Sequence, residues 1–478
     1  MLALSRRRRV VSLVLFLSSA AGLAQASCSS DDATGGAADA ATNDDATTRK
    51  DDASTSEGGS TTDAGSGNDA NATDSAVTDA GTDAADGGPD ASLVTCTASP
   101  CAIHLAAGTD QACVILSDKT VRCWGSNFMA ESGQPVPSDG GYGTALLAPL
   151  AVNGIAGARE LSLGAEHSCA LLENGTVQCW GSNRYAQLAM AADGGLAGAV
   201  RSPTPVTIAV TGTPANVSAG FYHTCIRRTD GSVQCWGYNS HAQIGNVLPD
   251  GGDLPLFVPA PTDALLTGVA ELDVGGRFAC GHLFDGGVSC WGHNVNGQLG
   301  RGGPPYNVAT DPRPAPVVGL PANVDHLGRS VAYTEGVVLG DKTVRIWGSN
   351  QYGNLGPVDG GSTGTPLEVA SVTNVAQIAF NLQNTCVLKT DGTVFCWGAT
   401  YSGGGGVNPD AGIQHPTPAQ VSGVSDAVAI ALGWDVFGCA LKKDGSVVCW
   451  GDNAFGQLGR GLTKAALPFD PVAAPVAF

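Results

Sequence analysis

Short stretches in which apolar and polar residues alternate recur along most of the chain. One of them runs from Cys169 to Cys179 and has Asn174-Gly175 at its centre. Alternation with a period of two is typical of half-buried β-strands, and Asn-Gly is a favoured hairpin turn. If Glu173, Asn174 and Gly175 form a three-residue loop, Cys169 lies directly opposite Cys179. The pattern therefore predicts a β-hairpin.

The same turn recurs in the other copies of this hairpin. It reads Asp-Gly in four of them, at Asp230-Gly231, Asp285-Gly286, Asp391-Gly392 and Asp444-Gly445. In two further copies a lysine takes the glycine position, at Lys119 and Lys342. A lysine forced into the left-handed region costs about 1 kcal/mol, so we expect strain there unless the turn type changes.

A Trp-Gly pair follows each hairpin and sets the period of the repeat. The seven copies are Trp124, Trp180, Trp236, Trp291, Trp347, Trp397 and Trp450, spaced by 50 to 56 residues. An Asn stands three residues later in six of them, and a Gly-Gln-Leu-Gly element follows, complete at 297–300 and 456–459. About 54 residues per copy are enough for four short strands and their connections. The repeat predicts seven similar four-stranded sheets.

Pairs of cysteines ten residues apart mark the hairpins of six copies. They are Cys113 and Cys123, Cys169 and Cys179, Cys225 and Cys235, Cys280 and Cys290, Cys386 and Cys396, and Cys439 and Cys449. The fifth copy has Gly336 and Ile346 instead. Both cysteines are lost together, as a bonded pair predicts, and opposed strand residues lie within disulfide range. We expect six disulfides within the hairpins and a seventh between Cys96 and Cys101. Buried free thiols are the alternative. A zinc site is disfavoured, because each copy has only one pair of cysteines.

These motifs resemble a known repeat family. The sequences Gly164-Ala-Glu-His167-Ser-Cys169, then Asn-Gly-Thr-Val-x-Cys-Trp-Gly-x-Asn, then Gly-Gln-Leu-Gly look like the regulator of chromosome condensation (RCC) repeat. The resemblance covers residues 102–478 and implies an all-β, seven-bladed β-propeller, which we assign to residues 96–478. We further expect the two ends of this segment to pair within one blade, because an edge strand would otherwise stay open at each end.

The N-terminus has the features of an export signal. Four arginines at 6–9 precede an apolar run at 10–23 that is too short for a permanent membrane span. Residues 1–27 are thus predicted to be a signal peptide. The sequence Gln25-Ala26-Ser27-Cys28 resembles a bacterial lipobox, which makes Cys28 the predicted lipidation site. Plain secretion, with cleavage after Ala26, is the alternative.

Residues 28–95 are built almost entirely from Asp, Ala, Thr, Gly and Ser. They carry 15 acidic residues against Arg49 and Lys50 and contain no aromatic residue. Such a composition predicts a disordered linker, with a reach of roughly 40–50 Å. The net charge of the whole chain is −19, which argues against nucleic acid and anionic membrane surfaces as partners. The membrane would then be reached only through a lipid anchor.

Few residues suggest a chemical site. His167 and His223 stand at a position that Phe278 and Phe437 fill in other copies, so we interpret them as packing residues. Trp434, outside the Trp-Gly motif and aligned with glycines of other copies, is a candidate partner contact. The loops after the Gly-Gln-Leu-Gly element share an acidic turn, and its carboxylates are candidate binding residues expected on one rim: Asp139, Asp193, Asp250, Asp359 and Asp410. With one carboxylate per loop, tight turns are favoured over calcium sites.

No catalytic motif and no metal or cofactor site is evident in the sequence. We therefore predict a monomeric, non-enzymatic binding module, exported as an outer-membrane or cell-surface lipoprotein or secreted freely, whose loops bind an unknown protein or glycan. Two alternatives stay open. The family resemblance implies regulation of a small GTPase by guanine-nucleotide exchange, and a propeller could also carry an enzyme acting on an extracellular polymer.

Overall fold

The computed structural model describes residues 93–137, 141–190, 200–252, 255–303, 308–358, 361–399, 414–434, 436–463, 465–476 and 478. The predicted signal peptide, Cys28 and nearly all of the predicted linker lie outside these residues. Within the described segments, no helix has the length and apolar character needed to cross a membrane.

The described chain forms short β-strands that pair in sequence order into antiparallel sheets, or blades. Blade 1 contains β1 (Ala102–Ala107), β2 (Gln111–Leu116), β3 (Val121–Gly125) and β4 (Leu146–Ala151). Blade 2 contains β5 (Ala158–Leu163), β6 (His167–Leu172), β7 (Val177–Ser182) and β8 (Arg201–Thr207). Blade 3 contains β9 (Pro214–Ala219), β10 (His223–Arg228), β11 (Val233–Tyr238) and β12 (Phe257–Asp263).

The later blades repeat this order, with one variation. Blade 4 contains β13 (Val269–Val274), β14 (Phe278–Leu283), β15 (Val288–His293) and β16 (Thr310–Pro316). Blade 5 contains β17 (Val324–Leu327), β19 (Thr334–Leu339), β20 (Val344–Gly348) and β21 (Thr363–Glu368). Blade 6 contains β22 (Val375–Phe380), β23 (Asn384–Lys389), β24 (Val394–Ala399) and β25 (Gln414–Gln420). Blade 7 contains β26 (Ala427–Gly433), β27 (Phe437–Lys442), β28 (Val447–Asp452) and β29 (Phe469–Pro475). The short β18 (Arg329–Ser330) leaves blade 5 and pairs in parallel with β22.

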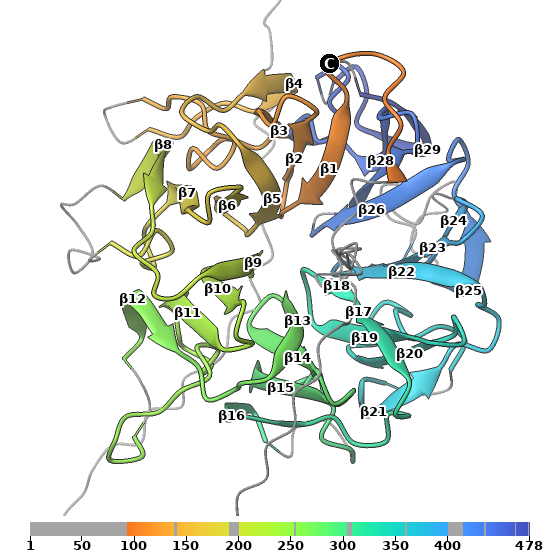
Figure 1. Ribbon diagram of the computed structural model, residues 1–478. Helices are drawn as coiled ribbons and strands as arrows, with labels where there is room; N and C mark the ends of the chain where they lie inside the picture. The colour runs from red at the N-terminus through yellow and green to blue at the C-terminus, as the bar shows by residue number, and fades with distance from the viewer. Residues whose placement is uncertain are drawn as a thin grey trace, which may run out of the picture. The chain divides into compact units, whose positions relative to one another are not determined.

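The seven blades surround a central axis (Figure 1). The first strand of each four-stranded blade lies nearest the axis, and the fourth strand lies at the rim. β18 extends the sheet of blade 6 beyond β22. This arrangement confirms the predicted all-β, seven-bladed propeller.

The predicted hairpin register is also confirmed. Cys169 pairs with Cys179 across β6 and β7. Lys119 and Lys342 both have a φ of 63°, so the turn keeps its type and the lysines occupy the left-handed region. The repeat therefore keeps its turn geometry even where glycine is missing.

All seven expected cysteine pairs form disulfides in the structure. Six of them join the second and third strands of a blade, each with a Cα–Cα distance of 4.1 Å: Cys113 to Cys123, Cys169 to Cys179, Cys225 to Cys235, Cys280 to Cys290, Cys386 to Cys396, and Cys439 to Cys449. The seventh joins Cys96 to Cys101 ahead of β1, with a Cα–Cα distance of 5.8 Å. The alternative of buried free thiols is therefore not what the structure shows.

Blade 5 replaces its disulfide by packing. Gly336 lies opposite Ile346 in the register of β19 and β20. A Cβ atom on Gly336 would lie 2.7 Å from Cζ of Phe380, which comes from β22 of the next blade. The Phe380 ring thus fills the space that the missing side chain leaves, and Ile346 and Phe380 belong to one buried apolar cluster.

The Trp-Gly and Gly-Gln-Leu-Gly motifs join neighbouring blades. Six of the indole Nε1 groups donate to a backbone carbonyl in the preceding blade, at the second residue of the Gly-Gln-Leu-Gly element or its counterpart. These bonds are Trp124 to Gln457 (2.8 Å), Trp180 to Glu131 (2.9 Å), Trp236 to Gln187 (2.8 Å), Trp291 to Gln243 (2.9 Å), Trp347 to Gln298 (2.9 Å) and Trp397 to Asn354 (2.7 Å). The glycine after each tryptophan has φ between 94° and 121°, at an irregularity in the strand register. Glycine is needed there because this region disfavours side chains.

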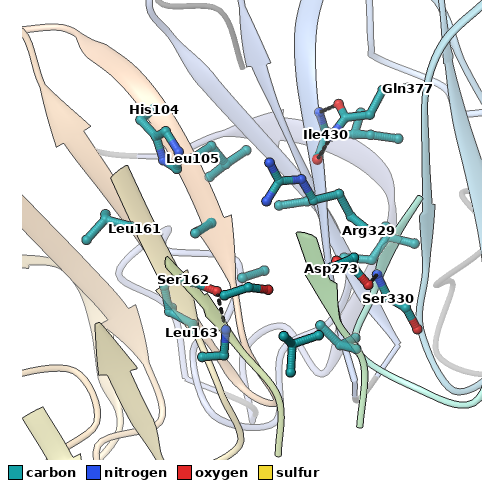
Figure 2. A pocket seen from close by; sticks show the side chains of 18 residues that line it. His104, Leu105, Leu161, Ser162, Leu163, Asp273, Arg329, Ser330, Gln377 and Ile430 are labelled. Carbon is teal, nitrogen blue, oxygen red and sulfur yellow. Dashed lines mark hydrogen bonds between the residues drawn. The ribbon is translucent and has the colours of Figure 1, made fainter. Parts of the chain in front are cut away.

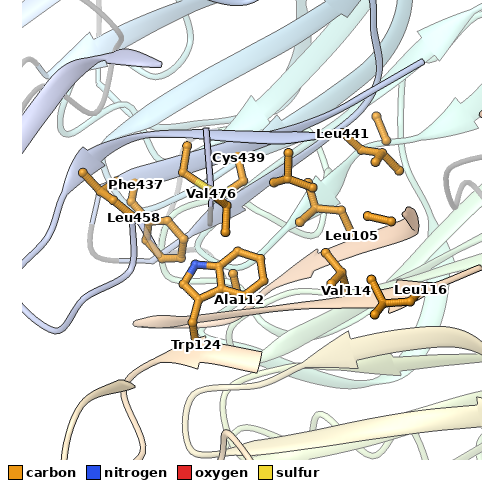
Figure 3. Close-up of a cluster of buried hydrophobic side chains, with 14 residues drawn as sticks. Leu105, Ala112, Val114, Leu116, Trp124, Phe437, Cys439, Leu441, Leu458 and Val476 are labelled. Atoms are coloured by element: carbon orange, nitrogen blue, oxygen red, sulfur yellow. A yellow bond between two sulfur atoms is a disulfide. The ribbon is translucent and has the colours of Figure 1, made fainter. Parts of the chain in front are cut away.

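The expectation that the chain ends share one blade is wrong. The last strand, β29, pairs with β28 inside blade 7, and β1 is the innermost strand of blade 1. Blades 1 and 7 instead close the ring through an apolar cluster in which Trp124 meets Phe437, Leu458 and Val476 (Figure 3). Residues 95–102 add backbone hydrogen bonds to the hairpin turn of blade 7, including Thr95 N to Lys443 O at 2.7 Å. Side-chain packing replaces the strand exchange that the sequence suggested.

Candidate functional site

Two kinds of loop between strands lie on the same face of the propeller. Because the strands of a blade alternate in direction, the turn after the first strand and the loop after the third strand lie on the same side. The turns carried by this face are 108–110, 164–166, 220–222, 275–277, 331–333, 381–383 and the residues after Gly433. We call this side the loop face; the Asn-Gly and Asp-Gly hairpins lie on the opposite face.

Backbone hydrogen bonds tie the turns of the loop face to one another. Phe221 N donates to Gly276 O, and Gly276 N donates to Ala332 O, each at 3.1 Å. Ala165 N donates to Phe221 O, and Trp434 N donates to Gly108 O across the closure of the ring, also at 3.1 Å. These bonds link turns of different blades, so the centre of the loop face is held in a defined arrangement.

Three aromatic side chains meet at the centre of the loop face. The rings of Trp434 and Phe221 lie 4.3 Å apart in an edge-to-face arrangement, and Tyr333 lies 5.6 Å from Trp434 and 6.2 Å from Phe221. They come from blades 7, 3 and 5, which are not neighbours, so their contacts bridge the axis. Trp434, a predicted partner contact, thus lies at the centre of the face and is partly exposed.

The alignment of Trp434 with repeat glycines is wrong by one residue. Gly433 takes the glycine position, since it pairs with Phe437 in the register of β26 and β27. Three residues separate Gly433 from Phe437, whereas two separate Gly108 from Gln111. Trp434 is therefore the first residue after the repeat glycine of blade 7.

A row of aromatic residues extends from this centre across blades 2 and 3. The Tyr185 ring lies 4.7 Å from Tyr222, 4.9 Å from Tyr238 and 6.1 Å from Phe257. Every tyrosine in the described part of the chain lies on the loop face: Tyr142, Tyr185, Tyr222, Tyr238, Tyr333 and Tyr352. Tyrosine and tryptophan provide large contact areas with few freely rotating bonds, so they are enriched at binding surfaces.

The channel along the axis is narrow, and both polar and apolar side chains line it. Figure 2 shows His104 and Arg329 on opposite sides of it, and the cavity volume of about 60 Å³ holds only a few water molecules. Several lining side chains bond to the next blade: Ala219 N donates to Ser162 Oγ at 2.9 Å, and Ile430 N donates to Gln377 Oε1 at 2.9 Å. Burial, aided by Arg329, lowers the pKa of His104 to about 3. The channel joins blades and has no room for a larger ligand.

A pair of buried carboxyl groups lies between blades 4 and 5, next to this channel. Burial raises the pKa of Asp273 to about 7, against the opposing charge of Arg329. Burial and the neighbouring Asp273 also raise the pKa of Glu335, which is fully buried and whose Oε1 accepts from Gly336 N at 2.9 Å. Burial and the unfavourable approach of two carboxylates thus both favour the protonated forms of the pair.

The predicted acidic turns are placed only in part. Asp250 lies in an exposed turn, where its Oδ1 accepts from Gly252 N at 2.9 Å, as a tight turn requires. Asp139, Asp193, Asp359 and Asp410 lie outside the described residues. In the described segments, no three His, Cys, Asp or Glu side chains come together as a metal site would need.

The two repeat histidines are buried, in line with their interpretation as packing residues. His167 Nε2 lies 2.8 Å from Thr224 Oγ1 of the next blade, and burial lowers the pKa of His167 and of His223 to about 3. Sequence reasoning overlooked the aromatic residues of the turns, Phe221, Tyr222 and Tyr333. The two positions that follow the repeat glycine vary widely between copies. This variation in the sequence could have indicated that the turns form a binding surface.

Comparison with known proteins identifies the repeat. The regulator of chromosome condensation (RCC1) repeat matches residues 159–187, 215–243, 375–403 and 427–457. These segments run from the first strand through the Trp-Gly motif of blades 2, 3, 6 and 7. The chain therefore contains RCC1 repeats.

Relatives of this RCC1-repeat protein have diverse functions. It is 29% identical over 315 residues to the ultraviolet-B receptor UVR8 of Arabidopsis thaliana, covering 63% of this chain and 66% of UVR8. It is 27% identical over 348 residues to the human E3 ubiquitin-protein ligase HERC2, covering 61% of this chain but only 7% of HERC2. The match thus spans less than two thirds of either relative's own length.

Solved structures share the fold. Human WBSCR16 superposes with a TM-score of 0.62 at 19% identity, covering 74% of this chain and 93% of that structure. Yeast RCC1 (Prp20), solved with Kap60 bound, gives a TM-score of 0.59 at 18% identity, covering 70% and 78%. Because the sequence identities are below 20%, the structural similarity shows only that the chains share the propeller fold. An RCC1-like propeller is a scaffold for binding or regulation.

Proposed function

We propose that this RCC1-repeat protein is an exported binding module that presents its loop face to a protein or glycan partner. The observation that carries the proposal is the distribution of aromatic residues. The described tyrosines, together with Phe221 and Trp434, gather on the loop face, where they are partly exposed. Partly exposed aromatic clusters on a rigid frame provide binding energy at a low entropic cost.

The disulfides support export. Six blades carry one each and Cys96–Cys101 adds a seventh, so all fourteen cysteines of the propeller are paired. Such bonds persist in oxidising compartments and are rare where thiols are kept reduced. Guanine-nucleotide exchange on a cytosolic GTPase is disfavoured by the same bonds.

We further propose that Cys28 carries a lipid and that residues 28–95 act as a tether. The mature protein should then be found in the membrane fraction, and Cys28→Ala should release it into the medium. Release of the unaltered protein would contradict the tether while leaving the binding proposal in place.

The binding proposal is tested by removing aromatic rings from the loop face. Tyr185→Ala and Phe257→Ala are compared with Phe284→Ala, whose ring is 67% exposed in a hairpin on the opposite face. Each purified protein is applied to a glycan array and used to capture partners from the medium and envelope of its source cells. The loop-face variants are expected to lose the wild-type interactions, and Phe284→Ala to keep them. Loss only with Phe284→Ala would overturn the proposal.

A further inference from the structure

A cavity of about 450 Å³ opens on the loop face near blades 1, 2 and 3. Three carboxyl groups, Asp110, Glu131 and Glu166, and three aromatic rings, Phe128, Tyr142 and Tyr222, line it. Its size lies within the range of small-ligand pockets. We call it the acidic pocket. It borders the aromatic row of Tyr185, Tyr238 and Phe257 and shares Tyr222 with it.

Glu131 gives the acidic pocket an acid where other blades have an amide. It occupies the position of Gln187, Gln243 and Gln298 in the repeat. Its carboxyl accepts from the Ser126 hydroxyl and from Met129 N at 2.6 Å, and burial raises its pKa. Glu131 therefore lies hydrogen-bonded at the floor of the pocket, beside Asp110 and Glu166.

Glu166 contributes an oxygen that no described group satisfies. Its Oε2 is buried and accepts no hydrogen bond within the described part of the chain. A buried carboxylate oxygen without a donor is costly, so a donor supplied by a ligand would be favourable. The field of Glu166 already acts on a cation: burial lowers the pKa of Arg184, but Glu166 together with Tyr185 and Tyr142 raises it, and the net shift is upward.

Aromatic side chains form walls of the acidic pocket and favour the binding of a cation. Tyr142 is 68% exposed at the mouth, and its ring lies 6.4 Å from that of Phe128, which packs on Phe455 at 5.2 Å. Tyr222 forms another side, and burial together with Glu166 raises the pKa of its hydroxyl. Ring faces attract ammonium and guanidinium groups, and desolvation strengthens that attraction.

The wall that carries Phe128 and Tyr142 is held in place from blade 2. The guanidinium of Arg201 donates to the carbonyl oxygens of Phe128 at 3.3 Å, Pro137 at 3.1 Å and Gly141 at 2.6 Å. A pocket wall whose backbone is already hydrogen-bonded at Phe128, Pro137 and Gly141 loses less entropy when a ligand binds.

We propose that the acidic pocket takes a lysine or arginine side chain of a protein partner. This rests on the proposed function, and it selects a protein over a neutral glycan because carboxylates and ring faces together favour a positive charge. The propeller also carries net negative charge, since residues 28–95 account for −13 and residues 6–9 for +4 of the total of −19. A basic partner would be attracted from a distance.

The test uses three probes on the mature protein, with saturation-transfer NMR to measure dissociation constants. They are the Nα-acetyl methylamides of lysine, arginine and norleucine, the last matching the lysine stem without its charge. At least one cationic probe should bind, and norleucine should bind about tenfold more weakly or not at all. Equal binding of norleucine, or no binding by either cation, would overturn the proposal.

Two variants locate the binding, and a third controls for charge. Glu166→Gln and Tyr142→Ala should each weaken the cationic probe several-fold, by roughly the strength of one ion pair or one cation–π contact. Glu173→Gln removes an exposed carboxylate in a hairpin on the opposite face and should have no effect. Unchanged affinity in Glu166→Gln would overturn the proposal. If partner capture still depends on Tyr185 and Phe257 while the cations fail to bind, the proposed function stands and only the cation site is wrong.

Discussion

The indole Nε1 of Trp124 donates a hydrogen bond to the backbone carbonyl of Gln457, 2.8 Å away, and joins the first blade of the ring to the last. The two residues are 333 positions apart in the sequence. The same bond repeats between successive blades, so the closure of the ring reuses the contact that builds its interior. Strand exchange is not needed.

Trp124→Phe should loosen this closure. The variant loses one buried hydrogen bond and leaves the Gln457 carbonyl unpaired, which costs about 1–3 kcal/mol. Hydrogen exchange measured by mass spectrometry should increase in β1 and in β28 to β29. Trp236→Phe removes the equivalent bond to Gln187 inside the ring and is the matched control. Equal protection of the terminal strands in both variants would contradict a special role for the contact between blades 1 and 7.

Gly336→Ala should destabilise blade 5. The added Cβ would lie 2.7 Å from Phe380 and 2.8 Å from Arg345 O, a crowding that typically costs about 1–3 kcal/mol. Phe380→Leu makes room, so the double variant should recover part of the loss, and a double-mutant cycle in denaturant measures the coupling. Additive effects would show that Phe380 does not replace the missing side chain.

Glu335→Gln should change how stability depends on pH. The pKa of Asp273 is raised to about 7 from its ordinary 3.8, and that of Glu335 is raised as well. The folded protein then holds protons that the unfolded chain releases, so this pair favours folding below pH 4 and loses that contribution as pH rises to about 7. An amide keeps a donor toward Asp273 without the second charge.

The free energy of unfolding of Glu335→Gln should therefore exceed that of the wild type at pH 8, by on the order of 1 kcal/mol, and approach it at pH 5. Denaturation at both pH values measures the difference. Glu173→Gln, an exposed carboxylate paired with Lys119, is the control and should show no such trend. If the variant gained less stability over the wild type at pH 8 than at pH 5, the raised pKa values of the pair would be contradicted.

Under non-reducing conditions the propeller should contain no free thiol. Seven disulfides remove fourteen hydrogens, which a mass measurement of the mature protein before and after reduction would detect. The same spectrum shows whether Cys28 carries a diacylglyceryl group. A smaller mass difference would mean that some pairs are buried thiols.

The fold was predictable where the determinants are local. The Asn174-Gly175 turn and the spacing of Cys169 and Cys179 determine the hairpin register without reference to other blades. Closure was not predictable, because it depends on Trp124 meeting residues more than 300 positions away. The central aromatic cluster was missed for the same reason, since Phe221 and Trp434 meet only after blades 3 and 7 are placed around the axis. Of the candidate site residues, Trp434 could be named from the sequence because it is the one tryptophan outside the Trp-Gly motif, and its role as a partner contact stays a prediction.

Photo-cross-linking shows directly whether the loop face is the binding face. p-Benzoylphenylalanine is introduced separately at Tyr142 and at Phe284, whose side chains are 68% and 67% exposed on opposite faces. Both proteins are irradiated in place on their source cells, and cross-linked products are compared by mass spectrometry. If the loop face binds the partner, position 142 should give a discrete product and position 284 none. Products from position 284 alone, from both positions equally, or from neither would contradict binding at the loop face.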